Sequence, residues 1–175
     1  MRLLKGFLFV LLGFFILVTL ISFLFPSKVI TVKAVTIHAS EEKIFSAIND
    51  LQQWKNWHPI FVQLQSKVEI SSPSEGTNAK ASWSLNNKLY SIVFSKVEKN
   101  FVQFNVNSSE EKPVETTLAI LYMQEPGTLQ VEWRAITHLK WYPWEKFAGI
   151  FVSEMTGPGY QQALDALQKY IEQGN

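Results

Sequence analysis

The chain begins with an unbroken apolar stretch. Residues 6–25 (GFLFVLLGFFILVTLISFLF) carry no charge, and only Thr19 and Ser22 are polar. As a helix with a rise of about 1.5 Å per residue, this stretch spans about 30 Å, the thickness of bilayer hydrocarbon. A secretory signal peptide has a shorter apolar region and a small-residue cleavage site, whereas this stretch ends in Phe-Leu-Phe-Pro. We therefore predict an uncleaved transmembrane anchor in residues 1–27, with a buried globular helix as the alternative.

The pattern after the anchor is that of a strand and two short helices. Residues 29–37 (VITVKAVTI) are rich in β-branched side chains, which favour a strand. Ser40 has the character of a helix N-cap, and apolar positions then recur at helical spacing as far as Leu51. Asp50 can cap a second short helix. Pro59 is expected to stop that helix, because proline disfavours helical geometry in the residue before it.

Hydrophobic and polar positions then alternate over much of the chain from residue 67 to residue 135, as in half-buried strands. Asn86-Asn87-Lys88 and Pro126-Gly127 interrupt the alternation and are typical of tight turns. Strands joined by tight turns pair in antiparallel fashion, so we predict a meander of about six strands after the first one. We expect these strands at residues 67–71, 79–85, 89–97, 102–107, 115–124 and 129–135.

The C-terminal segment returns to helical spacing. Residues 160–171 place apolar side chains on one stripe and polar side chains opposite. An aromatic segment precedes them at residues 141–155 (WYPWEKFAGIFVSEM), and Thr156-Gly157-Pro158-Gly159 is predicted to break the chain between the two. One long helix on a curled antiparallel sheet is an α+β architecture. Because such a helix does not fill the curl, we predict one domain over residues 28–175 with an internal cavity.

Composition and charge narrow the classes of function. The segment beyond residue 27 holds 14 of the 16 basic residues and all 15 acidic ones, without a lysine or arginine run, so we predict no nucleic-acid partner. The chain has no cysteine, which excludes disulfides and thiolate chemistry. Positive charges on the two sides of the apolar stretch are balanced. An N-terminal anchor ahead of a large domain favours a periplasmic or other extracytoplasmic location for that domain.

The order of elements and several short motifs resemble a known family. Residues 35–59 (VTIHASEEKIFSAINDLQQWKNWHP) look like the start of the START-like, helix-grip (SRPBCC) superfamily, and more narrowly of its polyketide cyclase/dehydrase group. The matching positions are Ile37, Ala39, Ile44, Phe45, Asp50, Leu51, Trp54, Trp57 and Pro59. Residues 74–83 (SEGTNAKASW) are similar to the family's Gly-x-Gly-Ala hairpin, with Asn78 in place of the second glycine. Residues 155–172 are similar to its terminal helix, with Ala163 where glycine is usual.

This resemblance covers residues 29–172 and implies a helix-grip fold with a cavity for a hydrophobic small molecule or lipid. It implies no particular reaction. By pattern, a set of aromatic and apolar side chains points to the interior, where lining and core are not separable from the sequence. The candidate cavity-lining residues are Trp57, Trp83, Phe94, Phe104, Trp133, Phe151 and Met155.

His58 is a weak candidate for catalysis. A general base needs an orienting partner and a substrate within reach, and the sequence places no acid or nucleophile to serve His58. We therefore expect a structural or solvent-facing histidine. His38 and His138 are too distant in sequence for short metal-site spacing, and no glycine-rich phosphate loop or Gly-x-Ser-x-Gly motif is present. We predict neither a metal nor a cofactor.

Three functions stay open at this point. The first is a membrane-anchored START-like domain that binds a hydrophobic small molecule or lipid, with residues 142–155 and the terminal helix as the gate. The second is a cyclase or dehydratase that uses His58 as acid or base in the same cavity. The third is a non-catalytic interaction module that binds a membrane partner. We favour the first and expect binding rather than catalysis.

Overall fold

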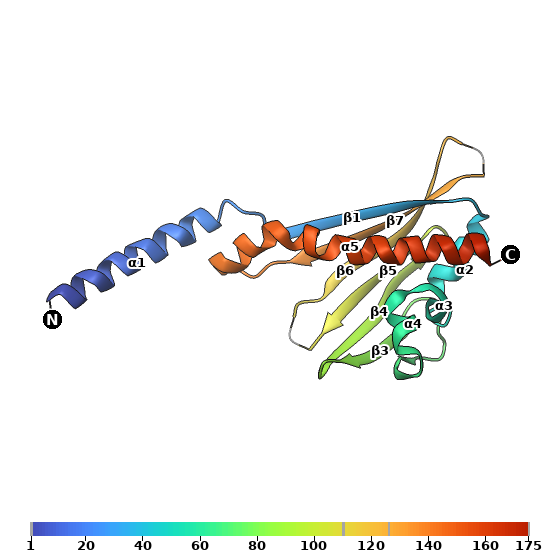
Figure 1. Cartoon of the computed structure of the whole chain (residues 1–175), viewed down its shortest axis with the longest axis horizontal. Coiled ribbons are helices and arrows are strands. Elements are labelled where there is room, and N and C mark those ends of the chain that lie inside the picture. The colour runs from blue at the N-terminus through green and yellow to red at the C-terminus, as the bar shows by residue number, and fades with distance from the viewer. Residues whose placement is uncertain (1, 110, 126, 175) are drawn as a thin grey trace.

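The computed structural model describes residues 2–109, 111–125 and 127–174, which form an isolated N-terminal helix and a folded body (Figure 1). The isolated helix is α1 (Arg2–Ser22). In chain order, the body contains β1 (Lys28–Ile37), α2 (Glu41–Asn49), α3 (Trp54–Trp57), α4 (Pro59–Leu64), the 3-10 turn η1 (Gln65–Lys67), β2 (Glu69–Ile70), β3 (Lys80–Leu85), β4 (Lys88–Glu98), β5 (Phe101–Ser108), β6 (Val114–Tyr122), β7 (Leu129–His138) and α5 (Pro143–Gln173).

Within the described residues, seven strands form one antiparallel sheet in the order β1-β7-β6-β5-β4-β3-β2. The strands from β2 to β7 follow one another as the predicted meander, and β1 adds to the edge of β7. Asn86 and Asn87 both have positive φ (51° and 62°), as a tight hairpin between β3 and β4 requires. Of the predicted turn at Pro126-Gly127, Pro126 lies outside the described residues, and Gly127 has φ of 77°.

The curved sheet and the long helix α5 confirm the predicted α+β, helix-grip architecture. Trp54 and Trp57 fill the space where α2 and α3 meet the sheet, and their indole N–H groups donate to the carbonyl oxygens of Ile48 and Ala47, each over 3.0 Å. These two bonds satisfy polar groups that would otherwise be costly to bury. Ser40 caps α2 as predicted, since its hydroxyl accepts from the N–H of Lys43 at 3.4 Å.

The first helices differ from the prediction at their ends. Asp50 ends α2 and does not cap α3, whose N-cap is Gln53. Instead, the Asp50 carboxylate accepts from the N–H of Gln52 and from the hydroxyl of Ser74. Pro59 stops α3 as expected, but it also opens α4, because the first helical position does not need the N–H that proline lacks. The strand predicted at residues 67–71 is shorter in the structure, where only β2 (Glu69–Ile70) has strand geometry.

The chain break predicted at residues 156–159 is wrong, because α5 continues through it as one helix of 31 residues. Gly157 serves packing there and not a turn: a Cβ at this position would lie 2.9 Å from Cε of Lys33 on β1. The Thr156 hydroxyl donates to the carbonyl oxygen of Val152 at 2.9 Å, beside Pro158. We call residues 143–155 the projecting half of α5 and residues 156–173 its covering half.

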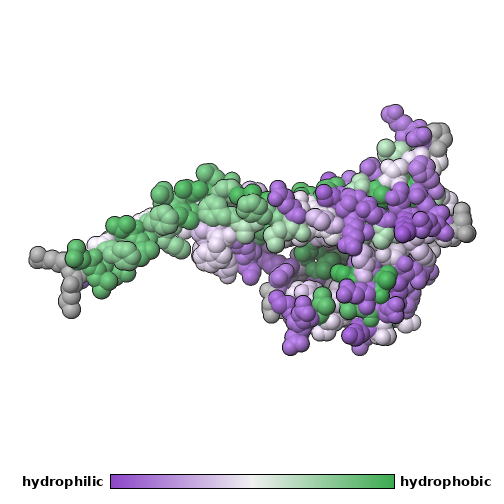
Figure 2. All heavy atoms as spheres, viewed as in Figure 1, coloured by the Kyte–Doolittle hydropathy of each residue, from purple (hydrophilic) through white to green (hydrophobic). Residues whose placement is uncertain are grey.

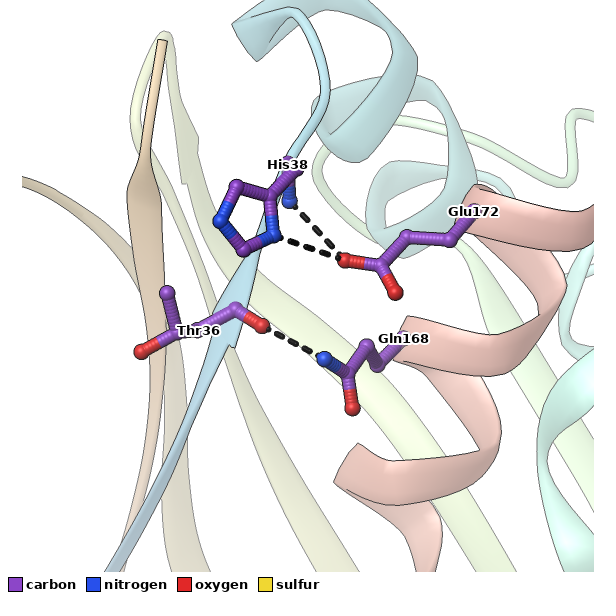
Figure 3. Close-up of polar contacts among 4 residues, drawn as sticks. All are labelled: Thr36, His38, Gln168 and Glu172. Atoms are coloured by element: carbon purple, nitrogen blue, oxygen red, sulfur yellow. Dashed lines mark hydrogen bonds and ion pairs between the residues drawn. The ribbon is translucent and has the colours of Figure 1, made fainter. Parts of the chain in front are cut away.

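The covering half runs along β1 and is fastened to it (Figure 1). Its buried side chains Ala163, Leu164, Leu167 and Ile171 join the core. Near the C-terminus, the Gln168 amide donates to the carbonyl oxygen of Thr36 at 2.8 Å, and the Glu172 carboxylate accepts from the N–H of His38 at 3.0 Å (Figure 3). The helix is thus held over the sheet by both apolar and polar contacts.

Helix α1 has no packing partner along most of its length. Residues Leu3–Ser22 have a mean hydropathy of 2.6, and the most apolar part of this segment is not buried against the rest of the described protein. Figure 2 shows hydrophobic atoms over most of its visible surface. By length and composition, α1 is therefore apolar enough to span a membrane.

Candidate ligand cavity

A cavity of about 320 Å³ lies between the sheet and the start of the covering half of α5. Figure 2 shows a hollow beneath α5 with hydrophobic atoms inside it. Apolar and aromatic side chains from five strands (β3 to β7) and α4 make up most of the wall: Ile60, Trp83, Ile92, Phe104, Val106, Val114 and Trp133. His58, Thr156, Tyr160 and Gln162 add polar groups. An apolar wall with a few polar groups is the usual form of a small-molecule site.

The strands supply this wall because successive side chains of a strand point to opposite faces of the sheet. Trp133 on β7 therefore faces inward, while Glu132 and Arg134 beside it form a more exposed pair with 3.7 Å between Oε1 and Nε. The Trp133 ring stacks on Tyr160 of α5, with ring centroids 5.3 Å apart. Burial raises the pKa of the Tyr160 phenol, so this side chain stays neutral. The contact joins the helix to the sheet at the side of the cavity.

The structure brings only part of the predicted lining together. Trp83, Phe104 and Trp133 line the cavity. Trp57 and Phe94 are buried in the core and lie outside the cavity wall. Phe151 and Met155, the other two predicted lining residues, do not contribute to the cavity.

Phe151 and Met155 are exposed, by 57% and 79% of their surfaces, and do not line the cavity. The physical reason is that the projecting half packs its Lys146 and Gly149 face on Leu139, just after the end of β7, whereas Phe151 and Met155 lie on the opposite face of the helix. No residue from 142 to 155 lines the cavity. The segment expected to act as a gate therefore does not close the cavity in this structure.

His58 is the residue that sequence reasoning undervalued. It lies between α3 and α4 with extended backbone (φ −72°, ψ 122°), and its N–H donates to the carbonyl oxygen of Trp54 at 2.8 Å. Its ring stacks on the Trp54 indole with centroids 5.2 Å apart and planes at 10°. Only 8% of the residue is exposed. Of the two expected alternatives, a structural or a solvent-facing histidine, the solvent-facing one is wrong, because the ring is turned inward onto the tryptophan just before Pro59 begins α4.

Burial lowers the pKa of His58 to about 3, so its imidazole is neutral at physiological pH. Its Nδ1 atom is buried without a hydrogen-bond partner in the described part of the protein, and the same holds for Nε1 of Trp133. The two rings lie 5.9 Å apart between centroids. Buried polar atoms are nearly always paired. The two unpaired nitrogens belong to rings that border one cavity, but both atoms are covered by protein, so a ligand's polar group would reach them only if the rings turn.

The two nitrogens have complementary chemistry. The indole N–H of Trp133 can only donate, whereas Nδ1 of a neutral imidazole accepts when the proton is on Nε2. A ligand hydroxyl can accept from Trp133 and donate to His58 at the same time. A carbonyl oxygen can accept from both when the His58 proton is on Nδ1. The other histidines lie at the surface, where His38 pairs with Glu172 and His138 with Glu115.

A family model described as polyketide cyclase/dehydrase and lipid transport matches residues 28–172. The chain belongs to this family. The predicted membership of the START-like group is confirmed, and the match covers nearly all of the folded body. A search of curated proteins found no match.

Solved structures show the same fold at low identity. A START superfamily protein from Mycobacterium smegmatis is 15% identical with a TM-score of 0.60, covering 83% of this chain and 99% of that one. Norcoclaurine synthase from Thalictrum flavum is 14% identical with a TM-score of 0.59, covering 82% and 93%. DynU16, from the dynemicin biosynthetic locus, is 13% identical with a TM-score of 0.59; the match covers 83% of this chain and about half (48%) of that one.

Proposed function

We propose that this family member is a membrane-anchored binding protein, which takes an apolar small molecule bearing one hydroxyl or carbonyl group into the cavity beneath α5. The observation that carries the proposal is the mainly apolar cavity bordered by the rings of His58 and Trp133, whose Nδ1 and Nε1 atoms have no partner. Helix α1 is the anchor. It supports a ligand source in the adjacent bilayer, with the folded body on the extracytoplasmic side.

The size of the cavity limits the ligand. At about 30 Å³ per heavy atom, the share of a water molecule in the liquid, a space of about 320 Å³ holds about ten heavy atoms. This fits a small ring system or part of one acyl chain and is too small for a whole two-chain lipid. Each 100 Å² of apolar ligand surface removed from water favours binding by about 2.5 kcal/mol, less the cost of fixing the ligand.

The nitrogen pair supplies selectivity. An apolar molecule of the same shape without an oxygen would leave both ring nitrogens unpaired, which costs about 1–3 kcal/mol for each buried group. The site therefore prefers the oxygenated molecule. The apolar wall supplies affinity, and His58 with Trp133 selects the functional group.

The proposal is tested by extracting the full-length protein in mild detergent and identifying bound small molecules by native mass spectrometry. We expect an apolar ligand with a hydroxyl or carbonyl group. It should be depleted from Ala163→Leu, which adds bulk to the cavity wall. Ala166→Leu on the same helix, whose residue does not line this cavity, serves as the matched control. Equal ligand content in wild type and Ala163→Leu would contradict the proposal.

Catalysis by His58 is the rival function, because the imidazole does border the cavity. However, a general base works best when its pKa lies near the operating pH, and a pKa of about 3 makes His58 a poor base. The similarity to norcoclaurine synthase keeps an enzyme in view but extends to the fold alone at 14% identity. If turnover of an extracted ligand is lost in His58→Asn while ligand binding persists, the enzyme is the better description.

A further inference from the structure

The projecting half of α5 exposes an unusual amount of apolar surface for a folded domain. Five large side chains on this half and just before it are each more than half exposed: Trp141, Trp144, Ile150, Phe151 and Met155. Soluble surfaces rarely gather apolar residues in this way, and such patches mark contacts with another surface. None of these residues takes part in the cavity described above.

This surface lies directly beside the end of α1. The rings of Phe25 and Phe147 meet edge to face with centroids 5.1 Å apart. The Lys146 ammonium donates to the hydroxyl of Ser27, and the N–H of Leu139 donates to the carbonyl oxygen of the same serine at 2.9 Å. The segment that leaves α1 is thus held against the projecting half, and Figure 1 shows the two helices adjoining.

The link between α1 and the folded body is short, so it limits how far the exposed apolar surface can lie from the end of α1. Residues 23–27 separate Ser22 from β1, and five residues reach at most about 18 Å even when fully extended. The contacts of Ser27 and Phe25 shorten this reach further. If α1 spans a bilayer, the part of the projecting half around Lys146 and Phe147 therefore stays close to the bilayer surface.

The chemistry of the surface fits a lipid interface. Trp141, Tyr142 and Trp144 form a chain of ring contacts, with neighbouring centroids 5.1 Å and 5.0 Å apart. Tryptophan and tyrosine concentrate at membrane–water boundaries because each has an apolar body and a polar N–H or O–H. Ile150, Phe151 and Met155 continue the exposed apolar surface along the helix. In Figure 2 the hydrophobic surface of α1 continues into the region beside the start of α5.

We propose that the projecting half of α5, together with Trp141, docks in the interface of the bilayer that α1 spans. This inference rests on the anchor role given to α1 above. The covering half begins at Thr156, a cavity-lining residue, next to the docked Met155. The cavity is therefore held at the bilayer surface, where a membrane-dissolved ligand needs to cross little water.

The absence of cysteine makes a site-specific test direct, since one introduced cysteine gives one label. The full-length chain carries a nitroxide at Phe151→Cys or, in a second variant, at Met155→Cys, and is reconstituted into phosphatidylcholine vesicles. Asp165→Cys, exposed on the covering half, is the matched control, and Phe14→Cys reports on α1. Collisions with oxygen, which concentrates in lipid, and with a water-soluble nickel chelate are measured by electron paramagnetic resonance.

We expect labels at 151 and 155 to meet oxygen readily and the nickel chelate several-fold less often than the label at 165. If the label at 14 is in lipid while those at 151 and 155 are in water, docking is overturned and the anchor survives. Labels at 151 and 155 shielded from both reagents would mean a protein partner or a second copy covers the surface, which also overturns docking. A water-exposed label at 14 would overturn the anchor and docking together.

Discussion

The covering and projecting halves of α5 belong to one continuous helix but have different surroundings. The covering half buries Leu164 and Leu167 completely and is fastened to β1 by Gln168 and Glu172 (Figure 3). The projecting half buries only small or polar residues, such as Gly149 and Lys146, and keeps large apolar side chains in contact with solvent. The difference teaches that the apolar side chains of the covering half form part of the core, whereas those of the projecting half have no role in the core.

The largest effect that separates the halves is the loss of a buried side chain. Leu167→Ala should lower the free energy of unfolding by about 2–5 kcal/mol, because it removes a fully buried side chain and leaves a cavity. Phe151→Ala should change it by less than about 0.5 kcal/mol in detergent, since Phe151 is exposed. Denaturant unfolding of the full chain, followed by circular dichroism, measures both. Equal losses would mean that the projecting half also belongs to the core.

The next largest effect is the pH dependence of stability that arises from His58, which borders the cavity beneath the covering half. The pKa of His58 is lowered to about 3 by burial, so below about pH 6.5 the unfolded chain takes up a proton that the folded chain does not. Stability therefore falls with falling pH, by about 2 kcal/mol between pH 7 and pH 5 at 1.36 kcal/mol for each pKa unit. His58→Asn and His58→Gln should remove this part of the slope. An unchanged slope in both variants would show that the imidazole takes up its proton while folded.

A smaller effect on stability is expected from the hydrogen bond that joins the covering half to β1. Gln168→Ala removes the hydrogen bond to the Thr36 carbonyl and should cost about 1 kcal/mol. Gln161→Ala is the matched control on the same half, because its amide reaches the exposed Asp165 and contributes less than about 0.5 kcal/mol. Thermal unfolding of the two variants should separate them. If they melt together, the bond to β1 does not hold the helix.

The smallest effect concerns Glu172. The N–H of His38 is the main cause that lowers the pKa of this carboxyl. A carboxyl group whose pKa is lowered in the folded state stabilises that state at pH values above its unfolded pKa, about 4.5. This stabilisation is lost as the pH falls through the folded pKa. Because the group is exposed to solvent, only a slight loss is expected. Glu172→Gln should flatten the stability curve in this acidic range alone, and a change near pH 7 would contradict the assignment.

Much of the fold could be predicted because the decisive signals are local. Alternation gave most of the strands, and Asn86-Asn87 gave the β3–β4 turn, since asparagine tolerates the positive φ that the turn needs. Ser40 marked the start of α2 through its own side chain. Pro59 was correctly predicted to stop α3, but its second use, as the first residue of α4, was missed. The glycines near Pro158 were misread as a chain break, whereas Gly157 lies inside α5 against Lys33.

The candidate site was less predictable because it depends on contacts distant in sequence. Periodicity separated inward from outward positions on the strands, so Trp83, Phe104 and Trp133 were placed correctly beside the cavity. It could not show that Phe151 and Met155 lie on the exposed face of α5. Nor could it show that the inward turn at Pro59 stacks His58 on Trp54. The sole sequence signal for that burial was the position of His58 between Trp57 and Pro59.

The attachment of α1 to β1 has a mechanical consequence if α1 is the membrane anchor proposed above. From α1 the chain runs almost directly into this strand, which is joined to β7 by ten residue pairs from Lys28–His138 to Ile37–Leu129. Tension between a moving membrane and the body would act along the strand axis. It would load the whole ladder in shear and not peel the pairs apart one after another, which makes this edge suited to resist pulling.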